Sequence, residues 1–125
     1  MDLRQLPDLE LAALVGVMFE MTLNALAECT CPAVFVAASE AAVREVLYRR
    51  RGVPAPARLF DAQHQVPLHS LRAVRALARH GAEQLEQEGF AAASALLFAC
   101  IEAEIPVDAT AAVPNFAQAE LRTLN

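Results

Sequence analysis

The sequence predicts an all-α protein, a small bundle of about four helices (two helical hairpins) plus a short C-terminal helical segment. Three observations lead to this prediction. Apolar residues recur at three- and four-residue spacing over long stretches. Most prolines and glycines fall between these stretches, where they interrupt regular structure. The length of 125 residues suits one folded unit, so we expect residues 1–125 to form a single helical domain.

The first helix is expected at residues 8–28. Asp8 and Glu10 stand in its opening turn, where acids interact favourably with the positive end of the helix dipole. The segment is apolar nearly all round, with Glu20 the only charge between Leu11 and Ala27. Such a pattern is typical of a helix that is buried on most sides.

The second helix is expected at residues 32–51. Pro32 suits the first helical position, and Gly52 suits the residue just after the helix ends. One face of this helix is formed by the apolar positions at helical spacing, which are Val36, Val43, Val46, Leu47 and the stem of Arg50. A short strand at residues 33–38 is the alternative for its beginning.

A loop is expected at residues 52–67, which contain three prolines beyond the glycine at position 52. Loops of this length are unusual in a compact domain unless they pack or bind something. We therefore expect Leu59 and Phe60 to attach the loop to the core.

The third helix, at residues 68–88, shows the clearest periodicity. Its predicted core stripe consists of Leu71, Val74, Ala78, Gly81 or Ala82, and Leu85. Gly89 marks the next turn, and the fourth helix is expected at residues 90–105, without charge before Glu102. Further on, Pro114 can start a short last helix that ends near Arg122.

The chain carries more apolar residues than one small core is expected to enclose. Its hydrophobic content is 56% and its charged content 20%. Two of the four expected helices are apolar on nearly every side. Part of the first or fourth helix is therefore expected to face a second subunit or another protein, and we expect a homodimer.

Charge is strongly segregated along the chain. Eight of the ten arginines lie between Arg44 and Arg79, and thirteen of the fifteen acids lie outside that stretch. Residues 44–80 carry a formal charge of +6, whereas residues 1–43 carry −5 and residues 81–125 carry −6. This pattern predicts a surface that meets a partner of complementary charge. Lysine is absent and alanine is abundant, which indicates GC-rich coding and a bacterial source.

Three arginines share a stripe on the third helix: Arg72, Arg75 and Arg79. Acids follow them on the same stripe, an order that opposes the helix dipole. We therefore expect these arginines to be compensated by acids elsewhere, and the candidates are Glu10, Glu20 and Glu28. A solvated face beside the core stripe is the alternative.

A second group of arginines ends the second helix: Arg49, Arg50 and Arg51. Cations at that end interact with the exposed carbonyl groups, at about 0.3–1 kcal/mol each. An anion contact is the alternative. Nucleic-acid binding is not expected, because the pI is about 5.1 and the chain has no tryptophan and one tyrosine.

The chemically reactive residues predict no catalytic site. Cys29, Cys31 and Cys100 are expected to be reduced thiols in the core, and a soft-metal or redox site is the alternative. Zinc sites need four ligands at characteristic spacing, which the sequence lacks. Ser70 is expected near the start of a helix, and no nucleophile elbow or phosphate-binding loop is present. We expect no enzyme activity, cofactor or metal.

The predicted function is that of a non-enzymatic interaction protein, an adaptor, inhibitor or small chaperone that docks an acidic or apolar protein. The first and fourth helices are expected to supply contact area, and the six arginines named above to select and orient the partner. The alternative is a regulatory module in which the loop around His64 and His69 closes over an anionic small molecule held by arginines.

We expect a cytoplasmic protein without a membrane anchor. Charged residues, among them Asp2 and Arg4, interrupt the first part of the chain, which does not resemble a secretory leader. The most apolar stretch, residues 9–27, contains Glu10, Glu20 and Asn24, which favours a buried helix over a membrane span.

Overall fold

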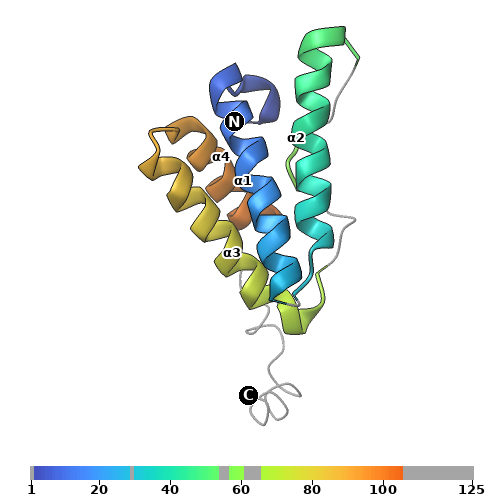
Figure 1. Ribbon diagram of the computed structural model, residues 1–125, viewed down its shortest axis with the longest axis vertical. Coiled ribbons are helices and arrows are strands. Elements are labelled where there is room, and N and C mark those ends of the chain that lie inside the picture. Colours follow the sequence, from blue (N-terminus) through green and yellow to red (C-terminus); the bar gives the residue numbers. More distant parts are fainter. Residues whose placement is uncertain (1, 29, 54–56, 61–65, 106–125) are drawn as a thin grey trace.

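All the regular secondary structure in the described part of the chain is helical. The computed structural model describes residues 2–28, 30–53, 57–60 and 66–105. It contains a short 3-10 helix and four α-helices (Figure 1): η1 (Leu3–Gln5), α1 (Asp8–Ala27), α2 (Ala33–Arg51), α3 (Leu68–Gln87) and α4 (Ala91–Glu104). The predicted all-α bundle is confirmed, and each helix boundary lies within one residue of its predicted position. Residues 33–38 are helical, so the strand alternative is wrong, and the predicted last helix lies outside the described residues.

Proline and glycine set the limits of these helices. Pro7, Pro32 and Pro67 each occupy the position before a helix begins. Gly52 follows α2 with φ 77°, a left-handed conformation that glycine adopts without strain and that is common just after a helix. The 3-10 helix was not predicted. Asp2 caps it, since the Asp2 side chain accepts a hydrogen bond from the Arg4 amide at 2.9 Å.

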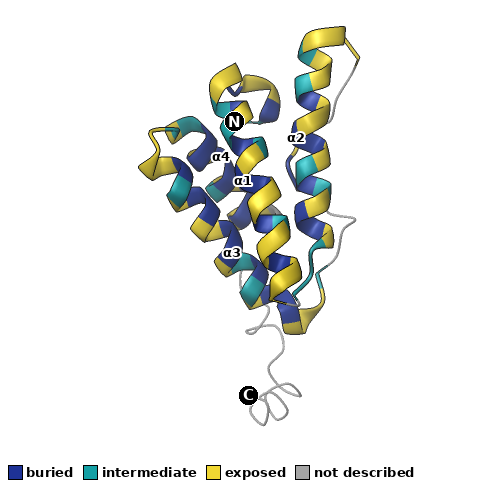
Figure 2. Cartoon of the chain, viewed as in Figure 1, coloured by how far each residue is buried: buried dark blue, intermediate teal, exposed yellow. Residues whose placement is uncertain are grey.

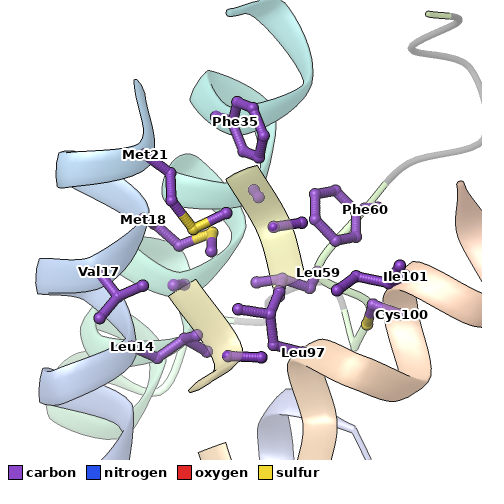
Figure 3. Close-up of a cluster of buried hydrophobic side chains, with 14 of the residues drawn as sticks. Leu14, Val17, Met18, Met21, Phe35, Leu59, Phe60, Leu97, Cys100 and Ile101 are labelled. Carbon is purple, nitrogen blue, oxygen red and sulfur yellow. The ribbon is translucent and has the colours of Figure 1, made fainter. Parts of the chain in front are cut away.

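The bundle is organised around α1, which packs against α2, α3 and α4 (Figure 1). Chain neighbours pair most extensively, so α1 with α2 and α3 with α4 form the two predicted helical hairpins. The buried side chains form one core, and Figure 3 shows α1, α2, α4 and the segment after α2 contributing to it. Leu59 and Phe60 are buried in that core, which confirms that they attach the loop.

The buried stripe of α3 agrees with its sequence pattern. Every predicted position is buried, both alternatives at positions 81 and 82 included. In α2 the apolar face recognised in the sequence is mostly not the buried one, although Val46 on it packs against the core. Val36, Val43 and Leu47 are each 41–42% exposed, and the buried face instead consists of Val34, Phe35, Ala38, Ala41, Ala42 and Glu45. Alanines allow close approach of two helix backbones, so the face with the smaller side chains packs inward.

The burial of α1 also differs from expectation. Only one of its faces is buried, formed by Leu11, Leu14, Val17, Met18, Met21 and Ala25. The opposite face is exposed although it too is apolar (Figure 2). By length and composition α1 is apolar enough to cross a membrane, a property shared by core helices of soluble proteins, and 33% of its apolar window is buried within the protein.

Gly81 of α3 lies directly against side chains of α1. A Cβ atom placed on Gly81 would lie 2.9 Å from Val17 Cγ1 and would overlap the Met21 sulfur. The β-branched Val17 has little rotameric freedom in a helix, so it cannot easily move aside. The absence of a side chain at position 81 therefore sets the spacing of these two helices.

We expect Gly81→Ala to destabilise the protein. Alanine improves helix propensity by about 1 kcal/mol, but overpacking costs about 1–3 kcal/mol, so the free energy of unfolding should fall. Gly16→Ala is the matched control, because no atom lies within 4 Å of a Cβ placed there, and it should gain about 0.5–1 kcal/mol. Urea unfolding of dilute protein measures both. Equal effects of the two substitutions would contradict the close packing at Gly81.

Candidate interaction site

Arg49 is the most highly connected side chain among the described hydrogen bonds. Its Nε donates to Glu45 Oε2 at 3.0 Å, and its guanidinium also donates to Asp8 Oδ1 at 2.5 Å. The same guanidinium donates to three carbonyl oxygens around η1, those of Leu3, Arg4 and Leu6. Arg49 thus anchors η1 and the start of α1 to the end of α2.

The electrostatics of this cluster fit an internal role. Glu45 is 1% exposed and lies in direct contact with the Arg49 guanidinium. Burial lowers the pKa of Arg49, but the hydrogen bonds and charges of Asp8 and Glu45 outweigh it, so the pKa is raised above its ordinary value. Arg49 was predicted to face a partner, yet the structure engages it inside the molecule. The Glu45–Arg49 spacing of four residues was the sequence signal for this pair.

The other two arginines of that group have a different environment. Arg50 and Arg51 are exposed in the last turn of α2, next to the carbonyl groups that end the helix. The structure therefore divides the predicted triple-arginine site into one anchoring residue and two surface residues.

Two of the three arginines of α3 lie on the outer side of that helix, and the third lies at the edge of its buried stripe. Arg72 and Arg79 are exposed, and Arg75 is partly buried. Arg79 forms an ion pair with Glu102 of α4, with 3.8 Å between nitrogen and oxygen. Exposed pairs of this kind contribute about 0.2–1 kcal/mol. Arg72 and Arg79 are thus accessible from solvent, one on each side of the partly buried Arg75 along the helix.

Two of the three predicted counter-ions on the first helix form hydrogen bonds with other groups, and the third, Glu28, is exposed. Glu10 accepts a hydrogen bond from the Ala93 amide at 2.7 Å, at the start of α4. Glu20 accepts one from Gln84 of α3 at 3.3 Å. The described partner of Arg79 comes from α4, because the α3–α4 hairpin brings that acid closer.

The exposed face of α1 carries an apolar stripe, which we call the outer stripe. It consists of Leu9, Ala12, Gly16, Phe19, Leu23 and Leu26, all exposed. The four large side chains are 70%, 62%, 50% and 57% exposed at Leu9, Phe19, Leu23 and Leu26. Figure 2 shows this exposure along the front of α1. By contrast, the exposed face of α4 presents only the small side chains Ala91, Ala95 and Ala99 before Glu102.

Of the two histidines predicted to line a ligand-binding loop, the structure describes only one. His69 is exposed in the first turn of α3, and Ser70 beside it is buried. His64 lies outside the described residues. Within the described ranges, no group of three or more His, Cys, Asp and Glu side chains is placed to hold a metal ion.

The described cysteines are reduced and lie in or against the core. Cys31 is partly buried, and Cys100 is buried beneath Leu59 and Phe60 (Figure 3). Burial raises the pKa of the Cys100 thiol, although hydrogen bonds from the backbone amides of Leu59 and Phe60 partly oppose the shift. Cys29 lies outside the described residues.

We expect Arg49→Met to destabilise the protein by about 3–5 kcal/mol, because it leaves Glu45 as a buried carboxylate without its cation. Arg50→Met, next in sequence and exposed, should change stability by less than about 0.5 kcal/mol. The double variant Glu45→Met/Arg49→Met should recover part of the loss, since no buried charge then remains. Chemical denaturation measures all three. A loss no greater than that of Arg50→Met would contradict the anchoring role.

Cys100 predicts a pH dependence of stability. In the unfolded chain the thiol ionises near its ordinary value of 9.0, whereas the folded protein holds the proton to higher pH. The folded state therefore binds more protons above about pH 9.0, and the free energy of unfolding falls as pH rises. Subtracting the pH profile of Cys100→Ala from that of the unaltered protein isolates this effect. Parallel profiles above this pH would contradict it.

No protein-family model matches the chain, and no curated protein or solved structure is significantly similar to it. The function is therefore argued from this chain's own residues, of which the outer stripe of α1 and the arginines of α3 are the prominent surface features.

Proposed function

We propose that the protein is a non-enzymatic, cytoplasmic interaction protein that assembles through the outer stripe of α1 and docks an acidic protein on the arginines of α3. The observation that carries this proposal is the outer stripe itself. Its four large apolar side chains are each at least half exposed on one face of one helix. Contiguous apolar surface of this kind is typical of protein interaction sites.

The large apolar side chains of the outer stripe gain free energy when they are removed from water. Burying a leucine or phenylalanine side chain stabilises a protein by about 1.5–3 kcal/mol relative to full exposure. The apolar core contains other residues of α1, so the outer stripe is not needed to hold the bundle together. A partner that covers the stripe gains this burial energy, which supports assembly through α1.

The arginines of α3 supply a different contribution. Arg72 is exposed, and the partner of Arg79 among the described residues is Glu102, in a long, solvent-exposed ion pair. An approaching acidic surface exchanges that weak pair for new ones at little cost. Charges of this kind accelerate encounter and select among partners more than they add affinity. The activities that fit are those of an adaptor, an inhibitor or a small chaperone.

A second candidate function is the binding of an anionic small molecule that regulates the protein. The observation that favours it is the position of His69 and Arg72, which are both exposed one turn apart at the start of α3. In that case the arginines would bind a ligand and not a protein surface.

We expect Arg72→Glu/Arg79→Glu to weaken capture of an acidic protein partner by at least about tenfold, through charge repulsion and slower association. Arg4→Glu/Arg44→Glu has the same change in net charge on other exposed positions and is the control. Quantitative affinity capture from extracts, with circular dichroism to verify folding, measures the effect. Identical captured proteins for both double variants would refute the docking role, and loss of a bound anion alone would favour the small-molecule function.

A further inference from the structure

The outer stripe follows a regular pattern. Its positions 9, 12, 16, 19, 23 and 26 are separated alternately by three and four residues, and all six are apolar. This is the spacing by which two α-helices pack along a common seam. The buried face of α1 already serves the core, so α1 carries a second packing face directed away from the bundle.

The sizes of the side chains along the stripe are complementary to the same stripe read in the opposite direction. An antiparallel copy aligned at the middle of α1 pairs the two small residues with large ones, Gly16 with Phe19 and Ala12 with Leu23, and it pairs Leu9 with Leu26. The centre of this pairing falls between residues 17 and 18, which is also the midpoint of the helix Asp8–Ala27. The full length of both stripes is therefore used.

A parallel arrangement is less complementary. It places Gly16 opposite Gly16, which leaves a void, and Phe19 opposite Phe19, which crowds the seam. In the antiparallel arrangement Glu20, the charged residue beside the stripe, lies level with residue 15 of the other copy, so the two Glu20 carboxylates are not opposed. Antiparallel helix dipoles also attract each other.

We propose that a second copy of this chain covers the outer stripe, with the two α1 helices antiparallel and Phe19 of each copy packed over Gly16 of the other. This inference rests on the proposed assembly through α1 and adds the occupant, the orientation and the register. The two-fold axis makes the interface isologous, as in most homodimers. Each copy then uses its outer stripe on the other copy, so this contact does not propagate into filaments.

The area of the proposed interface sets the expected affinity of the dimer. A helix of 20 residues is about 30 Å long and about 10–12 Å wide, which gives roughly 300–360 Å² for one copy and about 600–720 Å² for two. This is smaller than a standard specific interface, so a weak, reversible dimer that forms only at high protein concentration is expected. Because the seam contains no charged pair, the dissociation constant should be insensitive to salt.

The test uses Gly16→Leu, with sedimentation equilibrium across a range of protein concentrations. A Cβ at Gly16 meets nothing within 4 Å in the monomer, so the bundle should fold normally, which circular dichroism verifies. In the antiparallel dimer the new side chain collides with Phe19, and dimerisation should weaken by at least about a hundredfold. Ala95→Leu adds a leucine to the exposed face of α4 and should leave the dimer unchanged.

A compensating variant tests the register. Phe19→Ala alone removes the large partner and should weaken the dimer. Combined with Gly16→Leu it exchanges the large and small positions, so Leu and Ala again meet, and the double variant should recover dimerisation. Recovery would support the antiparallel pairing, because in a parallel dimer Gly16→Leu would instead fill the void and strengthen assembly.

Other outcomes overturn the inference. A protein that stays monomeric at all concentrations, or a dimer that Gly16→Leu leaves unchanged or strengthens, would do so. A dimer that dissociates in high salt would point to the charge blocks instead of α1. Monomeric protein that binds phosphatidylcholine vesicles through Phe19 would assign the stripe to a lipid surface.

The arginine variants keep this inference separate from partner docking. A dimer that is intact in Arg72→Glu/Arg79→Glu, with partner capture lost, supports both roles. Loss of the dimer in that variant would overturn the assignment of dimerisation to α1. If Gly16→Leu leaves the dimer intact while the arginine variants lose capture, the dimer inference fails and docking on α3 stands.

Discussion

All the other α-helices of the described bundle pack against α1, and they do so on one side of it. The absence of a side chain at Gly81 lets α3 approach Val17 and Met21 closely, and alanines let α2 approach in the same way. This crowding concentrates the core on one face of α1. The opposite face, equally apolar, is left in water, so the feature that organises the fold also creates the candidate interaction surface.

The second constraint is polar and lies at one end of the bundle. Arg49 satisfies three carbonyl groups around η1 and two carboxylates, and it thereby couples the first residues of the chain to the end of α2. Buried charges of this kind seldom add much net stability, because desolvation offsets their attraction. Their effect here is geometric: the direction of α2 is fixed, with Arg50 and Arg51 directed away from the core.

Much of the fold could be predicted from local signals, and the failures have a common cause. Helix limits followed from proline and glycine, and the face of α3 followed from its single apolar stripe. In α2 the valines and Leu47 form the more apolar face in the sequence, yet the face that contains the alanines packs inward, because small side chains permit closer helix packing. For α1 the pattern is apolar all round, so periodicity cannot tell which face packs inward; only the positions of its three neighbours do.

Only part of the candidate site could be predicted, because periodicity shows which face of a helix is exposed but not which distant residues meet. An exposed stripe on α3 follows from its position opposite a clear core face, so Arg72 and Arg79 were identifiable in the sequence. The role of Arg49 depends on η1, and this helix of three residues is too short to show a periodic pattern in the sequence. That an acid of α4 pairs with Arg79 depends on how the α3–α4 hairpin closes.

The two surfaces differ in the physics of recognition, and this difference separates their roles. Apolar burial along α1 is insensitive to salt and depends on the fit of Phe19 and its neighbours, so it suits the proposed self-association. The arginines of α3 act through exposed charge, which salt screens over about 10 Å, and therefore suit a contact that forms quickly and is exchanged. Because the stripes lie on different helices, occupying one does not consume the residues of the other. A chain with one such surface would either assemble or dock, whereas the two together allow an assembled protein to present its arginines in pairs.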